Sequence, residues 1–146
     1  MEFTADGKGG IRYEGLSLFH TENGAYTGSI LATEKAKRNA LSNFVSVDLL
    51  DSVRQKIIES ADLADYCGPF GVDMMLVTGG MAGRLSDSIT SAESRPLLLH
   101  PCVEINLRRT MGHMALRLSP KDDDLRHVMR IIYDGHHYKL KINKLL

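Results

Sequence analysis

The chain has 146 residues, enough for one domain with a hydrophobic core and too few for two domains of ordinary size. Its 18 Lys and Arg residues balance 18 Asp and Glu residues, so it lacks the charge pattern of a protein that binds nucleic acid or acidic membranes. Cys67 and Cys102 lie far apart without CxxC spacing, which indicates free thiols and a cytoplasmic location. No apolar run approaches the roughly 20 residues of a membrane span, and the acidic start is not a signal peptide.

The first 33 residues are predicted to form three strands, joined by the turns DGKGG and ENG. In the second strand, IRYEGLSLFHT, the apolar phase shifts across Gly15, which predicts a β-bulge there. Domains seldom start inside a sheet, so we expect the strand that begins at Met1 to continue a structure that precedes it. An exposed first strand would offer a sheet edge for pairing with a partner or a second copy.

The middle of the chain is predicted to form a long helix followed by two strands. Apolar residues repeat with the helical period from about residue 46 to residue 66. Residues 70–78 are apolar on both alternating faces except at Asp73, which indicates a strand covered on both sides. A polar loop at 79–95 leads to the strand LLLHPCVEINL, in which Pro101 marks a bulge or an edge.

A short helix at 111–118 and a hairpin complete the predicted elements. Thr110 is the expected helix cap, and the hairpin is expected to turn at Asp134 and Gly135. This order of elements predicts one α+β domain over residues 1–146, with a mainly antiparallel sheet, one long helix and one short helix.

Polar residues on the two middle strands form the candidate site. Side chains alternate across a strand, so Glu104, Asn106 and Arg108 share one face. If the two strands pair, Asp73 can lie across from Glu104 or Asn106, so that two carboxylates and an amide oxygen converge. Such oxygen ligands favour Mg²⁺ or Mn²⁺, which commonly bind nucleotide phosphates as well. The alternative is that Glu104 and Asn106 form a solvated strand face, which the acid in the apolar strand disfavours.

The segments GPFGVDMMLV and LHPCVEINLRRTMG resemble the end of the ATP-grasp domain. In that family, an acidic residue on one strand and a Glu-x-Asn pair on the next hold the magnesium ions of MgATP. The likeness extends back through RYEGLSLFHTENGAYTGS, so it covers about residues 1–118, with 119–146 as a hairpin extension. The resemblance implies that Asp73, Glu104 and Asn106 are metal ligands.

The resemblance also implies an activity. Arg108 would be a catalytic residue that faces the reacting phosphate, and Arg109 would either contact the nucleotide too or cap local carbonyls. Enzymes of this family activate a carboxylate as an acyl phosphate, which an amine or another nucleophile attacks. The family's lysine-bearing nucleotide lobe has no counterpart in this sequence, so we expect the chain to be inactive without it. The alternative is a non-catalytic module that acts in self-association, as a homodimer through an exposed sheet edge, or in partner binding.

Overall fold

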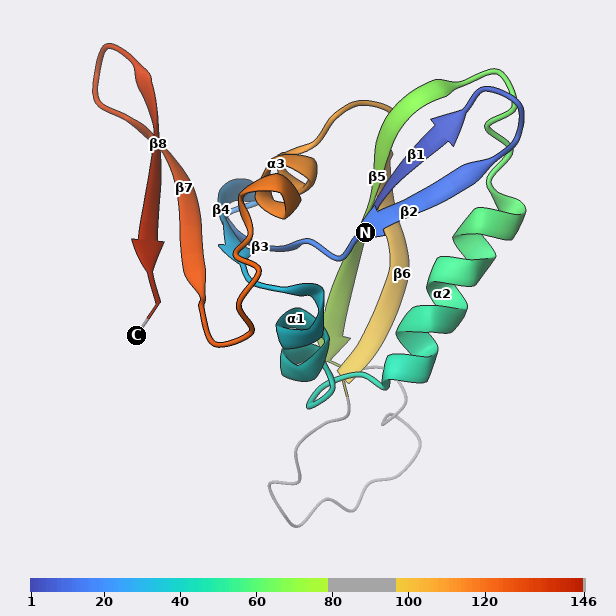
Figure 1. Cartoon of the computed structure of the whole chain (residues 1–146), viewed down its shortest axis with the longest axis horizontal. Helices are drawn as coiled ribbons and strands as arrows, with labels where there is room; N and C mark the ends of the chain where they lie inside the picture. Colours follow the sequence, from blue (N-terminus) through green and yellow to red (C-terminus); the bar gives the residue numbers. More distant parts are fainter. Residues whose placement is uncertain (79–96, 146) are drawn as a thin grey trace, which may run out of the picture.

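The computed structural model describes residues 1–78 and 97–145 and contains two antiparallel sheets (Figure 1). The strands are β1 (Glu2–Asp6), β2 (Ile11–Gly15), β3 (Leu18–Glu22), β4 (Ala25–Leu31), β5 (Cys67–Thr78), β6 (Leu97–Asn106), β7 (His127–Tyr133) and β8 (Tyr138–Lys144). The helices are α1 (Glu34–Leu41), α2 (Val47–Ser60) and α3 (Met111–Leu118). Sheet A has the strand order β2-β1-β5-β6, and sheet B has the order β3-β4-β7-β8.

The expected α+β class is confirmed, with differences in detail. The strands form two sheets in place of the single sheet that we predicted, and α1 is a helix that the sequence reading missed. The long helix ends at Ser60 rather than near residue 66. The predicted polar loop at 79–95 lies outside the described residues. None of the described helices is long and apolar enough to cross a membrane.

Gly15 divides the predicted second strand between the two sheets. The expected bulge is present, because Glu2 pairs with Gly15 while Phe3 pairs with Tyr13. The chain then leaves sheet A and enters sheet B as β3. Gly15 has a φ of 152°, and a Cβ added to it would lie 2.9 Å from a methyl carbon of Leu116 on α3. The close approach of α3 therefore requires glycine at the point where the chain changes sheets.

The first strand lies inside sheet A. β1 pairs with β2 on one side and with β5 on the other, both antiparallel. The expectation that this strand is an exposed edge is therefore wrong. The edge strands are β2 and β6 in sheet A and β3 and β8 in sheet B.

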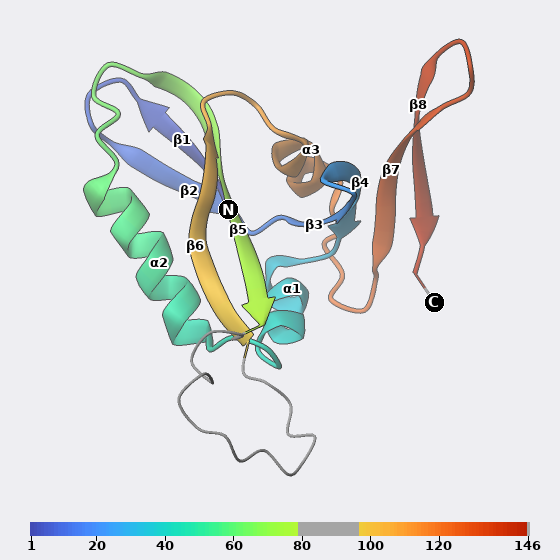
Figure 2. The same ribbon diagram turned by 180° about the vertical axis from the view of Figure 1, so that it is seen from behind.

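Helix α2 covers the apolar face of sheet A (Figure 2). The rings of Phe3 and Phe70 stack with centroids 5.1 Å apart, and Leu50 of α2 is buried in the same cluster. Burying a side chain of this size stabilises a fold by about 1.5–3 kcal/mol. On β5 this cover extends to Met74 and Leu76, which pack against the cluster. Met75, which is 51% exposed, and Val77, which is 36% exposed, belong to the opposite face of the strand. The prediction that the strand is covered on both faces holds only for its first half.

Helix α3 packs against sheet B through Ala115, which meets Leu31 of β4 and Met129 of β7. Thr110 caps α3 as predicted, since its hydroxyl accepts a hydrogen bond from the His113 N–H. The predicted C-terminal hairpin is formed by β7 and β8. Because β7 pairs with β4, the hairpin belongs to sheet B, and its far end projects away from the other elements (Figure 1).

Helix α1 holds the connection between the two sheets. The buried Lys37 side chain donates a hydrogen bond to the Leu16 carbonyl at 2.6 Å, and burial lowers the pKa of its amine. The Glu34 carboxylate accepts hydrogen bonds from the Tyr13 hydroxyl and the Leu16 N–H at 2.7 and 2.8 Å. These contacts fix the segment between β2 and β3, which lies beside the candidate site.

Candidate functional site

The face of sheet A opposite α2 carries a row of polar side chains. Phe3 and Phe70 face α2, so the alternate residues of β1 and β5 point the other way. The predicted pairing of β5 with β6 is confirmed, and its register places Asp73 opposite Glu104. Gly71 faces Asn106 in the same pair of strands.

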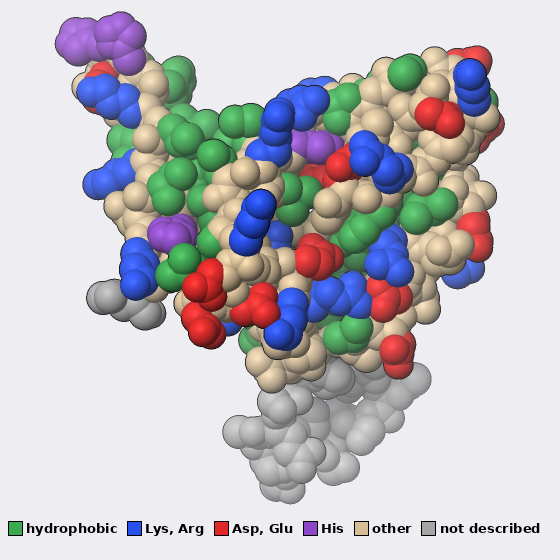
Figure 3. Space-filling view, in the orientation of Figure 1, with side chains coloured by type: hydrophobic (Ala, Val, Ile, Leu, Met, Phe, Trp, Pro, Cys, Tyr) green, Lys and Arg blue, Asp and Glu red, His purple; other side chains and the backbone are tan. Residues whose placement is uncertain are grey.

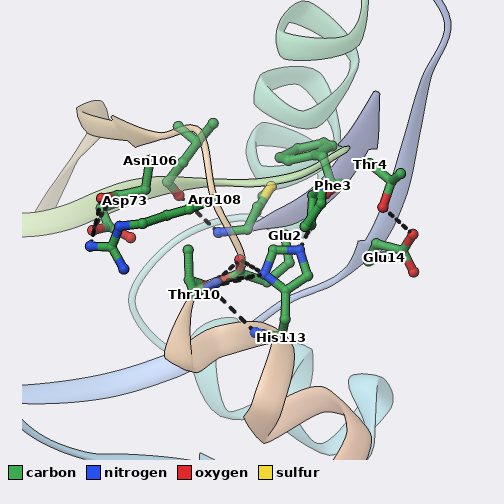
Figure 4. A network of polar contacts seen from close by, with 12 residues as sticks. Glu2, Phe3, Thr4, Glu14, Asp73, Asn106, Arg108, Thr110 and His113 are labelled. Atoms are coloured by element: carbon green, nitrogen blue, oxygen red, sulfur yellow. Dashed lines mark hydrogen bonds and ion pairs between the residues drawn. The ribbon is translucent and has the colours of Figure 1, made fainter. Parts of the chain in front are cut away.

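Asp73, Asn106 and Arg108 form a chain of hydrogen bonds (Figure 4). The Asn106 amide nitrogen donates to an Asp73 carboxylate oxygen at 3.3 Å, and an Arg108 guanidinium nitrogen donates to the Asn106 amide oxygen at 3.2 Å. Together with Glu104, these residues line a pocket of about 760 Å³, whose other walls include Leu18 of β3. The structure thus brings together four of the five residues that the sequence singled out.

An irregularity in β6 sets this arrangement. Met75 pairs with His100, so a regular ladder would place Cys102 opposite Asp73. The register shifts by two residues between these points, next to Pro101, and Glu104 takes the position instead. Pro101 removes a backbone donor, which is tolerated at bulges and on edge strands. Both alternatives predicted for this proline, a bulge and an edge, are present, since β6 is also an edge strand of sheet A. The bulge places the Glu104 carboxylate at the site.

The carboxyl group of Asp73 is electrostatically strained in its ionised form. Burial raises its pKa, and the charge of Glu104 raises it further, while the Met1 amino group, Arg108 and Asn106 act in the opposite direction. The Met1 amino group is buried nearby and donates to the Val72 carbonyl at 2.9 Å. A cation between the Asp73 and Glu104 carboxylates would favour the ionised form of Asp73 and so oppose both causes of the raised pKa.

The donor set fits a hard divalent cation. Mg²⁺ keeps several waters and needs only one or two protein carboxylates, which Asp73 and Glu104 provide. Among the residues described, no group of three or more His, Cys, Asp or Glu is placed to hold a metal. Asn106 directs its oxygen toward Arg108 in this arrangement. Its amide must therefore turn before the oxygen can join a cation held by the two carboxylates.

A second polar network, centred on Glu2, lies next to the first. The sequence did not predict it. Glu2 is 3% exposed. The Thr110 hydroxyl donates to its carboxylate at 2.7 Å, and His113 Nδ1 lies 3.0 Å from the same oxygen. His113 Nε2 lies 3.2 Å from the Phe3 carbonyl oxygen, within hydrogen-bonding distance (Figure 4). This network attaches the start of α3 to the middle of sheet A.

Gly112 allows that attachment. A Cβ added to Gly112 would collide with the Glu2 carboxylate and would lie 3.0 Å from the Ser17 Cβ. The glycine therefore brings the first turn of α3 against the sheet. The only signals in the sequence were the Thr110 cap and the short motif TMGH, neither of which identifies Glu2 as the partner.

Arg109 lies apart from the predicted metal ligands. It lines a second pocket of about 510 Å³, together with Arg12, Arg117 and His113. Arg108 lines the first pocket, so these two consecutive arginines line different pockets on the same side of sheet A.

Comparisons of the chain with protein-family models, with curated proteins and with solved structures find no match. Its function is therefore inferred from the geometry of the site and from the resemblance in sequence.

Proposed function

We propose that this chain is the metal-binding part of an ATP-grasp ligase that activates a carboxylate as an acyl phosphate. The observation that carries the proposal is the meeting of Asp73 and Glu104 in one pocket, with Asn106 and Arg108 attached to Asp73 by hydrogen bonds. The sequence resemblance to the ATP-grasp domain implies site roles for the same four residues. We place the protein in the cytoplasm, where MgATP and reduced thiols are both present.

The residues have separate roles in this proposal. Asp73 and Glu104 hold Mg²⁺ or Mn²⁺, and Asn106 completes the set after its amide turns. The ion supplies positive charge to the phosphates of ATP. Arg108 extends from the same cluster, so its guanidinium can donate to the phosphoryl group that is transferred. We leave Arg109 out of the nucleotide site because it lines the other pocket.

Titration of Mn²⁺, followed by its electron paramagnetic resonance signal, tests the metal site. We expect weak, saturable binding to the wild-type chain that is lowered at least about tenfold by Asp73→Asn and by Glu104→Gln, because each removes a charged ligand. Asp62→Asn is the matched control, since it removes one exposed carboxylate beyond the end of α2. Equal Mn²⁺ binding by Asp73→Asn and Asp62→Asn would remove Asp73 from the site.

The proposal also expects the chain alone to lack ATP hydrolysis, because the lysine-bearing lobe of the family has no counterpart in this sequence. Isothermal titration with ATP in the presence of Mg²⁺ measures what the isolated chain binds. Tight ATP binding would show that no second lobe is needed for the nucleotide. Joining the chain to an ATP-grasp nucleotide lobe and assaying for acyl-phosphate formation would test the activity itself.

A second candidate function, self-association through a sheet edge, is favoured by β8. Every residue of this edge strand is exposed, and its apolar side chains Tyr138, Leu140 and Ile142 are between 43% and 78% exposed. Exposed edge strands with an apolar face pair readily with another strand. Sedimentation velocity at rising protein concentration tests this function, with Leu140→Lys as the disrupting variant. A monomer at all concentrations would exclude the homodimer.

A further inference from the structure

The second pocket on the polar face of sheet A has an excess of positive charge. Its guanidinium groups come from three elements: Arg12 on β2, Arg109 on the segment before α3, and Arg117 in the last turn of α3. Among the described residues that line it, only Glu14 carries a carboxylate. Figure 3 shows Lys and Arg side chains gathered around a histidine on this face of the molecule.

That one carboxylate is already engaged. A Glu14 oxygen lies 2.7 Å from the Arg12 guanidinium and accepts a hydrogen bond from the Thr4 hydroxyl, also at 2.7 Å. Within residues 1–78 and 97–145, neither Arg109 nor Arg117 makes an ion pair. Two guanidinium groups therefore face the pocket without an opposing charge, which is an arrangement that attracts anions.

The base of the pocket is held firmly. His113, which is 5% exposed, lines it and contacts the Phe3 carbonyl and the Glu2 carboxylate. Arg109 and Arg117 are the arginines nearest the two ends of α3, and α3 is fixed to the sheet through Thr110 and Gly112. The backbone positions of the arginines are thus set before any ligand arrives, which reduces the entropy lost on binding.

We propose that the pocket between Arg12, Arg109 and Arg117 binds an oxyanion of a small molecule, a phosphate or a carboxylate. Guanidinium groups match the oxygen spacing of both anions and bind them in pairs of hydrogen bonds. The site is separate from the pocket of Asp73 and Glu104, because the network of Glu2, Thr110 and His113 stands between them. It does not depend on the proposed ligase function.

Two probes, inorganic phosphate and citrate, test the proposal by nuclear magnetic resonance of the full ¹⁵N-labelled chain. Each is titrated without divalent metal, and chloride keeps the ionic strength constant, so that non-specific salt effects are removed. We expect saturable shifts of amide signals in residues 109–117. Saturation by phosphate at the lower concentration identifies a phosphate ligand, and saturation by citrate first identifies a carboxylate ligand.

Four variants locate the binding. Arg109→Ala and Arg117→Ala should each raise the dissociation constant of the better probe about tenfold, which corresponds to one lost charge-assisted contact. Lys56→Ala removes one positive charge from α2, on the other side of sheet A, and should leave the constant within about twofold. Absence of saturation with both probes, or equal weakening by Lys56→Ala, overturns the proposal. So does a loss of binding in Arg108→Ala alone, since that would place the anion in the first pocket.

Discussion

Two acidic residues on the same face of sheet A have very different surroundings. Glu2 is almost fully buried, and its carboxylate has partners in Thr110 and His113. Asp73 is less buried, yet within the described part of the chain its carboxylate accepts one long hydrogen bond, from Asn106, and lies opposite another acid, Glu104. The comparison shows that burial alone does not identify a functional acid. An acid whose partners do not outweigh its burial and the like charge beside it is the better candidate for holding a ligand.

The largest expected effect concerns the close packing around Glu2. We expect Gly112→Ala to lower the free energy of unfolding by about 3 kcal/mol, because the new methyl group collides with the Glu2 carboxylate. At an exposed helix position the same change would raise stability by about 1 kcal/mol. The sign of the change in the free energy of unfolding therefore distinguishes the two cases. Urea unfolding measures it, with Arg117→Ala on the same helix as the control. If the close contact is the cause, Glu2→Ala will make the chain less sensitive to Gly112→Ala.

An isosteric pair of variants compares the two acids directly. Glu2→Gln removes the charge that Thr110 and His113 contact, and we expect it to cost about 2 kcal/mol of stability. Asp73→Asn removes a charge whose favourable contacts are outweighed by burial and by Glu104, so it should change stability by less than about 0.5 kcal/mol or raise it. Equal losses in urea unfolding of both variants would erase the distinction between a structural and a functional acid.

The smallest expected effect is a pH dependence that belongs to Asp73. Its pKa is raised in the folded state, so the folded chain binds this proton more tightly than the unfolded chain does. Stability from this group therefore falls as the pH rises from the ordinary value of 3.8 through the raised value. We expect Asp73→Asn to remove this component of the slope in urea unfolding between pH 3.8 and neutrality. Added Mg²⁺ should reduce the slope in the wild-type chain, since the ion competes with the proton. A slope that is identical in wild type and variant would contradict the assignment.

Local signals in the sequence were sufficient for much of the fold. The period of apolar residues located α2, the cap at Thr110 located α3, and the Asp134–Gly135 turn located the last hairpin. The alternation of side chains along two strands also predicted that Asp73 lies near Glu104. Their proximity depends only on the position of each residue within its strand and on the pairing of the two strands.

The features that sequence reasoning missed depend on contacts between distant residues. Helix α1 buries a lysine, Lys37, which removes the apolar stripe that would have revealed the helix. The division of a strand at Gly15 depends on the approach of Leu116 from α3. The partners of Glu2 lie more than 100 residues later in the chain, since Glu2 and Thr110 are 108 positions apart. No local pattern carries such information.

The interior position of β1 has a consequence for the order of folding during synthesis. β1 and β2 are synthesised before β5, so one side of β1 stays unpaired until β5 is made, and its Val72 lies 71 residues after Met1. At about 5–20 residues per second, the ribosome leaves that strand edge open for several seconds. Pairings between such distant segments slow folding and expose strand edges to aggregation. Until β5 emerges, the nascent chain therefore exposes a strand edge that is paired in the finished protein.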